Sequence, residues 1–281
     1  MRKYYSLVTL LSAITFCDSL LIHADSQPSP ANSTNILLKP QVVDQNYPGA
    51  AVFTPPAGWR LADSANLGKS IKVMVVGKGK RELPPSINLT TERYAGTLKQ
   101  YLKLIKDINA AQGNEWKDLG TIQTKSGNAS LSQSNSKTNW GDMRMMHLVL
   151  FKNKTIYIMT AAALTEEFAT FYQDFFNSMS SLTINPDAYE MIKDPQTRKQ
   201  LTQSVSALET QWNQFLQVHQ EQVKHGASFD SLFSEKEFQD NTWKPFLAQL
   251  EEKYGPMGAS WQESLIASIE EDLILLKNKR N

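Results

Sequence analysis

Cysteine and histidine are scarce in this sequence. Its 281 residues include one cysteine, Cys17, and four histidines. A single cysteine excludes an internal disulfide, and removal of Cys17 with an N-terminal signal would exclude thiol chemistry as well. An enzyme without Cys or His needs paired carboxylates in a cleft. Since the acidic residues fall mostly on predicted helix faces, the composition favours a binding protein over an enzyme.

The sequence also lacks a strong charge of one sign and a long apolar run after its N-terminus. The formal net charge is +1, which does not indicate nucleic-acid binding. No later stretch reaches the ~20 apolar residues that an integral membrane span needs. A hydrophobic share of 41% and a charged share of 20% are typical of a globular protein.

The charge changes sign along the chain. Residues 25–185 hold 17 Lys/Arg and 12 Asp/Glu, a net of +5, whereas residues 186–281 hold 10 and 15, a net of −5. This change coincides with a change of pattern at Asn185-Pro186. We therefore predict an α/β sandwich domain over residues 50–185 and a helical domain over residues 186–281.

The N-terminus has the pattern of a signal peptide. Arg2 and Lys3 precede an apolar run over residues 7–17, and Ala24 closes an approximate cleavage site. We expect residues 1–24 to be removed and the protein to be periplasmic or secreted. A lipid anchor at Cys17 is the alternative, which the bulky Phe16 disfavours. Residues 25–49, rich in Ser, Pro, Asn and Gln, are predicted to form a flexible tether.

The centre of the first domain is a predicted hairpin. Two apolar runs, residues 143–151 and 156–162, flank Lys152-Asn153-Lys154-Thr155, in which Asn153 suits a left-handed turn. Both faces of each run are apolar, so we expect the hairpin to be covered on both sides. After Thr165, a candidate N-cap, the apolar period changes to that of a helix. One face of this helix carries Phe168, Phe171, Tyr172, Phe175, Met179 and Leu182.

Other elements precede this hairpin. Strands are predicted at residues 71–76, 86–90, 116–124 and 129–134. Thr97 and Gln100 form a capping box that opens a helix ending at Gly113. Trp59 follows the turn 55–58, and Trp116 opens a strand.

The second domain shows only helical patterns. Asp194 and Pro195 predict the start of a long helix that ends at Gly226. Its apolar face comprises Leu201, Val205, Leu208, Trp212, Phe215, His219 and Val223. Further capping boxes are predicted at Ser234 with Glu237 and at Ser260 with Glu263, and the helix containing Pro245 is expected to restart at Thr242. Together these helices predict a bundle of three or four members.

The pair Trp212 and Phe215 has two interpretations. Both residue types are enriched in the energetic centres of interfaces, so part of this stripe could contact a partner. The alternative is that the stripe is the core of the bundle.

The sequence offers no catalytic, cofactor-binding or metal residue, and we expect none. Gly68-Lys69-Ser70 lacks the first glycine of a phosphate-binding loop. Ser134 with Lys137, Ser86 with Asn88 and Lys125-Ser126-Gly127 occur in the wrong order for a serine acyl-enzyme. His219 and His225 are six residues apart and lie on different helix faces. Met143, Met145, Met146 and His147 suit Cu(I), but the alternative is that they fill the core.

Two surface features remain. Lys69, Lys72, Lys78, Lys80 and Arg81 form a basic region, interpreted as a solvated hairpin end or else as a contact for an anionic partner. Asn-x-Ser/Thr sequons occur at Asn32, Asn88, Asn128 and Asn153 and matter only in a host that glycosylates exported proteins.

The predicted fold class is α+β: an antiparallel sheet sandwiched by helices, followed by an all-helical C-terminal bundle. The order of elements in residues 50–184, with Trp59 after its turn, Trp116 opening a strand and the exit from residues 160–162 to Phe168, resembles the PsbP/DcrB-like α/β sandwich superfamily. The resemblance implies an exported protein that binds partners and carries over no functional residue. We therefore expect an exported, non-enzymatic binding or assembly module of the cell envelope, which contacts an envelope or secreted protein partner through the helical tail or the sandwich surface. The alternative is a hydrolase of unrecognised type that uses carboxylates.

Overall fold

The computed structural model describes residues 47–63, 67, 71–81 and 83–278. Their contacts divide them into two compact units. The first contains Val52–Glu92 and Gly96–Thr183, within the described ranges, and the second contains residues 47–51, 93–95 and 184–278. The predicted signal peptide, most of the tether and the fragment Gly68-Lys69-Ser70 lie outside the described residues, so expectations that concern them stay predictions.

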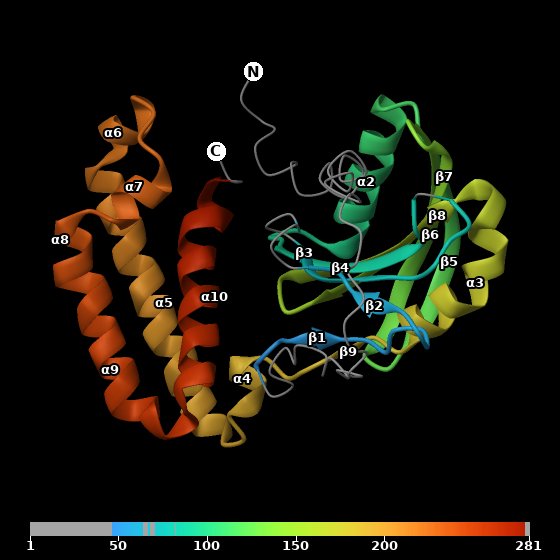
Figure 1. Ribbon diagram of the computed structural model, residues 1–281. Helices are drawn as coiled ribbons and strands as arrows, with labels where there is room; N and C mark the ends of the chain where they lie inside the picture. Colours follow the sequence, from blue (N-terminus) through green and yellow to red (C-terminus); the bar gives the residue numbers. More distant parts are fainter. Residues whose placement is uncertain (1–46, 64–66, 68–70, 82, 279–281) are drawn as a thin grey trace, which may run out of the picture. The chain divides into compact units, whose positions relative to one another are not determined.

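The first unit is built on a seven-stranded antiparallel sheet with helices, as the sequence predicts (Figure 1). The strand order is β2-β3-β4-β8-β7-β6-β5. The strands are β2 (Arg60–Leu61), β3 (Ile71–Val76), β4 (Ser86–Arg93), β5 (Glu115–Thr124), β6 (Gly127–Thr138), β7 (Gly141–Lys152) and β8 (Thr155–Leu164). A separate two-stranded sheet pairs β1 (Ala51–Val52) with β9 (Thr183–Ile184).

The central hairpin is confirmed as β7 and β8, which occupy the middle of the sheet. Asn153 and Lys154 form its two-residue turn with φ of 51° and 59°, the left-handed pair that matches the twist of the flanking strands. The pairing runs without a shift from Met143 opposite Leu164 to Lys152 opposite Thr155. Strands β5 and β6 are longer than predicted.

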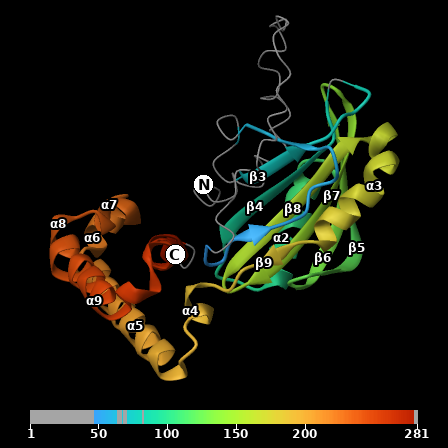
Figure 2. The same ribbon diagram turned by 60° about the horizontal axis from the view of Figure 1, so that its bottom comes forward.

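Helices cover both faces of the sheet. The guanidinium of Arg144 on β7 lies 5.7 Å from the ring centroid of Phe168 in α3 (Thr165–Ser180). Lys106 in α2 (Leu98–Ala111) lies 6.0 Å from the ring centroid of Trp116 on β5. The registers place Arg144 and Trp116 on opposite sides of the sheet. It follows that α2 and α3 pack on opposite faces, as Figure 2 also shows.

The helix caps confirm one prediction and correct another. Thr97 and Gln100 form the expected capping box of α2. Thr165 is not the N-cap of α3, because the helix already includes it and Leu164 occupies the cap position without a side-chain hydrogen bond. The acidic residues Glu166 and Glu167 instead interact favourably with the positive end of the helix dipole.

The second unit is helical. Its helices are α4 (Ala188–Met191), α5 (Pro195–Val218), α6 (Gln220–Lys224), α7 (Phe229–Phe233), α8 (Lys236–Phe238), η3 (Gln239–Trp243), α9 (Lys244–Tyr254), η4 (Gly255–Met257) and α10 (Ala259–Asn278). Asp194 caps α5 by accepting a hydrogen bond from the backbone of Thr197 at 2.7 Å, as predicted.

Four predicted boundaries in this unit are wrong. The long helix does not run unbroken to Gly226, since His219 (φ −97°, ψ 19°) separates α5 from α6. The Nδ1–H of His219 donates to the carbonyl of Phe215 at 2.9 Å, an acceptor that the backbone N–H of His219 also uses. Ser234 ends α7 rather than opening a helix, and Ser260 lies inside the first turn of α10. Pro245 lies in the first turn of α9, which begins at Lys244 rather than at the predicted Thr242 and follows the π-helical segment η3 directly.

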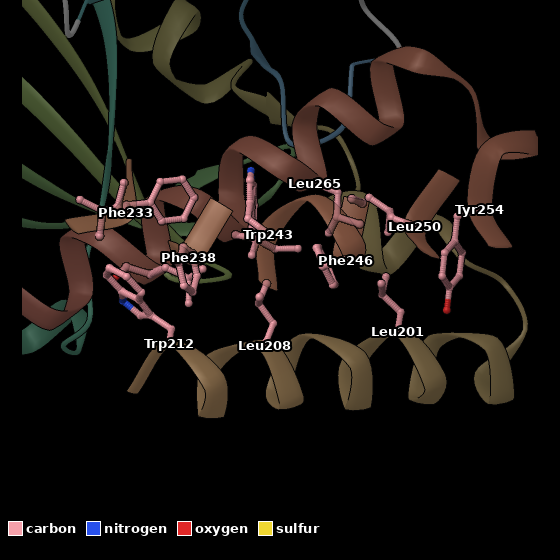
Figure 3. Packing of buried hydrophobic residues seen from close by; sticks show 14 of the residues in the cluster. Leu201, Leu208, Trp212, Phe233, Phe238, Trp243, Phe246, Leu250, Tyr254 and Leu265 are labelled. Atoms are coloured by element: carbon pink, nitrogen blue, oxygen red, sulfur yellow. The ribbon is translucent and has the colours of Figure 1, made fainter. Parts of the chain in front are cut away.

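The core of the second unit is aromatic (Figure 3). Trp212 is fully buried, and its ring centroid lies 4.6 Å from that of Phe238. Its indole N–H donates to the carbonyl of Leu273 at 2.8 Å. Trp261 likewise donates to the carbonyl of Ala188 at 2.8 Å. Of the two interpretations of the Trp212 stripe, the structure supports the bundle core.

Within the described part of the chain, no helix combines the length and the apolar character required to cross a bilayer.

Candidate functional site

A polar seam crosses the sheet on the face that α2 covers. Alternate residues of β6, namely Ser132, Ser134 and Ser136, point to this face. The register places Ser132 opposite His147 on β7, and His147 opposite Thr160 on β8. Three neighbouring strands therefore bring hydroxyl groups to both sides of one histidine.

Both ring nitrogens of His147 are engaged. Nε2 lies 2.9 Å from the hydroxyl oxygen of Ser134, and Nδ1 lies 3.1 Å from that of Thr160. Burial lowers the pKa of His147 from 6.5 to about 4, since the charged imidazolium is poorly solvated there. At neutral pH the ring is uncharged, so one nitrogen donates a hydrogen bond to a hydroxyl and the other accepts one.

This arrangement does not form an accessible catalytic site. A neutral histidine beside a serine is the geometry that activates a serine nucleophile. However, the Ser134 residue is only 1% exposed, so no substrate can reach its hydroxyl in this conformation. We interpret the Ser134–His147–Thr160 set as a satisfied buried polar network.

The contacts of His147 and of the neighbouring methionines are relevant to the hypothesis that they bind Cu(I). Met143, Met145 and His147 share one face of β7 as predicted, and Met146 points to the other. Met143 and Met145 are buried in a cluster with Leu83 and Leu164, and the hydroxyls occupy both nitrogens of His147. Among the described residues no three His, Cys, Asp or Glu side chains gather as metal ligands do. These contacts favour core packing, and the expected lack of a metal stays a prediction.

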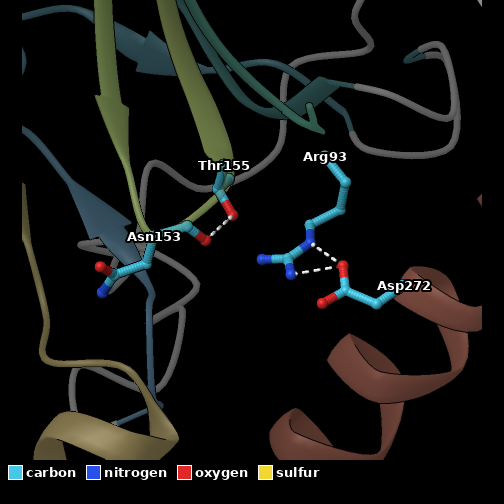
Figure 4. Close-up of polar contacts among 4 residues, drawn as sticks. All are labelled: Arg93, Asn153, Thr155 and Asp272. Atoms are coloured by element: carbon cyan, nitrogen blue, oxygen red, sulfur yellow. Dashed lines mark hydrogen bonds and ion pairs between the residues drawn. The ribbon is translucent and has the colours of Figure 1, made fainter. Parts of the chain in front are cut away.

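Two carboxylates of the second unit, Asp187 and Asp272, have well-defined partners. Asp272 in α10 accepts hydrogen bonds from the Nε and a terminal nitrogen of Arg93, at 3.1 Å and 2.5 Å (Figure 4). The pKa of the nearby Tyr189 is raised, first by burial and then by the negative charges of Asp272, Glu209 and Asp187. Asp187 caps α4 through the backbone of Glu190 at 2.8 Å. Asp187 and Asp272 thus have structural partners, which does not favour the carboxylate-hydrolase alternative.

The basic region of the first unit is partly neutralised. Lys72, Lys78 and Lys80 are exposed, and Lys69 lies outside the described residues. The backbone N–H of Lys80 donates to the buried carboxylate of Glu167 at 2.8 Å, and Arg81 pairs with Glu166 at 3.0 Å. Both acidic partners come from the first turn of α3. The loop is therefore held against α3, which favours its interpretation as a hairpin end.

The other fragments show no functional geometry. Ser134 lies within strand β6 rather than at the start of a helix. His219 lies 3.6 Å from Glu235, and the Nδ1–H of His225 donates to the carbonyl of Glu221 at 2.7 Å.

The sequons differ in exposure. Asn88 is buried in β4, so the folded chain has no room for a glycan there. Asn128 and Asn153 are exposed in or beside hairpin turns. In the Asn153 sequon, the hydroxyl of Thr155 donates to the backbone carbonyl of Asn153 at 3.5 Å (Figure 4).

A pair of aromatic side chains forms the most distinctive surface feature of the first unit. Tyr172 is 44% exposed although it belongs to the predicted buried stripe of α3, and its ring stacks on Phe176 with centroids 6.4 Å apart. Phe168 and Phe175 on the same helix are buried. This pair was not predicted, because helical periodicity places the whole stripe, Tyr172 included, in the core and leaves Phe176 outside it. The additional aromatic four residues after Tyr172 was the available signal.

On α3, the residues one helical turn before and after this aromatic pair carry no charge. Helix α3 contains no lysine or arginine. Of its three acidic residues, Glu167 is buried, Glu166 pairs with Arg81, and Asp174 is exposed. Aromatic enrichment combined with depletion of charge is typical of the core of a protein–protein interface. We define Tyr172 and Phe176 as the α3 aromatic pair.

Comparison with known proteins finds similar solved structures but no matching family. No family model and no curated protein matches the chain. Solved structures that match include LpqN of Mycobacterium tuberculosis, involved in cell envelope biogenesis, at 16% identity and a TM-score of 0.35 over 50% of this chain and 86% of that one. Cyanobacterial PsbP of Synechocystis matches at 12% identity and a TM-score of 0.34, over 48% of this chain and 86% of that one.

A third match is the Saccharomyces cerevisiae Ran-binding protein Mog1p. Its identity is 12% and its TM-score 0.33, over 49% of this chain and 97% of that one. These neighbours all have the PsbP/Mog1-like α/β fold, the one that the order of elements resembles. The similarity extends over about half of the chain and concerns the fold alone.

Proposed function

We propose that this protein is an exported, non-enzymatic binding module that docks a protein partner on its sandwich unit. The observation that carries the proposal is the α3 aromatic pair, in which Tyr172 is 44% exposed and Phe176 is partly buried, on a helix without lysine or arginine. Aromatic side chains contribute large apolar area at low entropic cost and dominate the energetics of many interfaces. The partner is an envelope or secreted protein, in keeping with the predicted signal peptide.

The second unit offers less for a partner to bind. Its Trp212, Phe238 and Trp243 are buried against one another or against neighbouring rings. Val218 is its one strongly exposed large apolar side chain within the described range, at 78%. An isolated exposed apolar residue is normal on a protein surface. We therefore place the partner site on the sandwich rather than on the helical tail.

The experiment compares two variants of the full chain in its own cell envelope. Tyr172→Ser combined with Phe176→Ser removes the aromatic pair, and Val218→Ser is the matched control because it removes an exposed apolar side chain from the other unit. Each protein is crosslinked in the envelope, purified through a tag and analysed for bound partners. Thermal unfolding of both variants checks that the fold is intact.

We expect the double variant to lose the crosslinked partner with little change in melting temperature, and the control to retain it. If the double variant keeps the same partner, the aromatic pair is not the docking surface. If the double variant is unfolded, Tyr172→Ser alone repeats the test at the more exposed of the two positions.

A further inference from the structure

A positively charged side chain lies close to the α3 aromatic pair. The guanidinium of Arg144 on β7 lies 5.7 Å from the ring centroid of Phe168, and the rings of Phe168 and Tyr172 have centroids 6.5 Å apart. Tyr172 in turn stacks on Phe176. These contacts connect Arg144 to the aromatic pair through one buried ring. Because a standard interface covers about 800 Å² of each partner, one partner can contact both Arg144 and the aromatic pair.

Two neighbours hold the side chain of Arg144 in place. Alternation along β7 directs Met143 and Met145 to the α2 face and Arg144 to the α3 face. Asn135 lies directly opposite Arg144 on β6, and its side-chain oxygen accepts a hydrogen bond from Nε at 3.0 Å. With Nε bound to Asn135 and the guanidinium beside Phe168, the group is positioned before any partner arrives.

The charge of Arg144 is not neutralised by its neighbours on the sheet. Glu115 is on the same face, but Asn135 lies on the strand between the two charges and donates to the Glu115 carboxylate at 3.0 Å. Asp142, also on this face, lies opposite Lys137. Within the described residues, the terminal nitrogens of Arg144 have neither an ion pair nor a hydrogen-bond acceptor. Arg144 is half-buried, and these nitrogens are not enclosed.

We propose that Arg144 binds a carboxylate of the partner protein, an Asp or Glu side chain next to the apolar residues that cover the α3 aromatic pair. The two terminal nitrogens of a guanidinium can donate two parallel hydrogen bonds to a carboxylate. Arginine and tyrosine are both enriched among the residues that dominate the binding energy of interfaces. The inference rests on the proposed function and adds the chemistry of the partner surface, an acidic side chain beside an apolar one.

The surroundings of Arg144 favour a single carboxylate over a polyanion. A nucleic acid or an anionic lipid surface carries closely spaced negative charges, which would meet Glu115 and Asp142 as well as Arg144. Helix α3 contributes no lysine or arginine to offset that repulsion. A polyanion also offers no apolar area to Tyr172, whereas a protein surface offers charge and apolar area side by side.

The test selects peptides from a random library displayed on phage, with the full chain as the immobilised target. Arg144→Gln removes the charge, and Arg144→Glu reverses it. Arg144→Lys keeps the charge but loses the paired donors of the guanidinium. Lys106→Glu is the matched control, because Lys106 is also an exposed cation near a ring, 6.0 Å from the centroid of Trp116 on the opposite face of the sheet. Thermal unfolding checks that each variant is folded.

We expect the wild type and Lys106→Glu to enrich peptides in which an Asp or Glu neighbours an aromatic or aliphatic residue. A selected peptide resynthesised with Gln in place of that acid should bind the wild type about tenfold more weakly. Arg144→Gln should bind both peptides equally, and Arg144→Lys should keep a weaker preference for the acid. Arg144→Glu should enrich basic residues at that position instead.

Two results would overturn the proposal: a wild type that enriches no acidic peptides, or an Arg144→Gln variant that keeps the wild-type preference. The Gln-substituted peptide is measured on the wild type, so this arm does not depend on any variant folding. The proposed function fails separately, when Tyr172→Ser with Phe176→Ser retains the crosslinked envelope partner. If that double variant loses its partner while the Arg144 variants select the same peptides as the wild type, the aromatic pair docks a partner without Arg144.

Discussion

Acidification should destabilise the sandwich unit through His147. Burial holds the pKa of this residue at about 4, below its ordinary 6.5. The unfolded chain therefore binds a proton at a higher pH than the folded chain does. The contribution of neutral His147 to stability is complete above pH 6.5, is lost as the pH falls toward 4 and changes no further below that.

The size of the effect follows from the two pKa values. The difference between 6.5 and about 4 corresponds to about 3 kcal/mol, at 1.36 kcal/mol per pKa unit. The ring nitrogens of His147 form hydrogen bonds with the hydroxyls of Ser134 and Thr160. Because a hydroxyl is uncharged, neither group supplies a negative charge that would stabilise the imidazolium. A loss of this size is a large fraction of the free energy of unfolding of a typical domain, which is about 5–15 kcal/mol.

The measurement compares the wild-type chain with His147→Gln in urea unfolding between pH 7.5 and pH 4. Glutamine can still form a hydrogen bond with Ser134 but does not titrate in this range. The helical unit is identical in both proteins, so the difference between their pH profiles isolates His147. His225→Gln is the matched control, because His225 is exposed.

We expect the wild type to lose about 3 kcal/mol more than His147→Gln over this range, and His225→Gln to follow the wild type. Parallel profiles for the wild type and His147→Gln would refute the reasoning, since they would mean that His147 is solvated in the folded chain. Titration of the His147 ring by NMR provides a second readout, with an expected midpoint near pH 4.

Three further predictions concern the predicted domains. A chain ending at Asn185 should unfold cooperatively, because the hairpin and α3 form a continuous core of their own; an insoluble or molten product would show that the helical tail is needed. Trp212→Ala should destabilise the helical unit by about 3–5 kcal/mol in calorimetry, through the cavity it leaves, whereas Val218→Ser should change it by less than about 0.5 kcal/mol. N-terminal sequencing of the exported protein should begin near Asp25; a chain starting at an acylated Cys17 would indicate a lipoprotein signal instead.

The features that the sequence predicted well are local. The hairpin turn at Asn153, the capping box of Thr97 with Gln100 and the N-cap at Asp194 each depend on a few neighbouring residues. The capping boxes at Ser234 and Ser260 failed because the helix boundaries of the bundle depend on packing as well as on local capping signals. A serine that suits an N-cap can also lie inside a helix, as Ser260 does, or directly after one, as Ser234 does.

The candidate sites depended on residues far apart in the chain. Periodicity assigned Tyr172 to the buried stripe of α3, but Tyr172 is 44% exposed while Phe168 and Phe175 of the same stripe are buried. Periodicity could not distinguish a buried Trp212 from an exposed one, because burial requires α7 to α10 to close over α5.

The sequence alone determined the types of the main elements, the central hairpin and the change from strands to helices near Asn185. Local periodicity, turn residues and caps decide these features before any long-range contact forms. Only the tertiary structure decided that β5 is an edge, that His147 is neutral between two hydroxyls and that Tyr172 is exposed. Each of these depends on strand order and on the packing of distant segments, which no local pattern encodes.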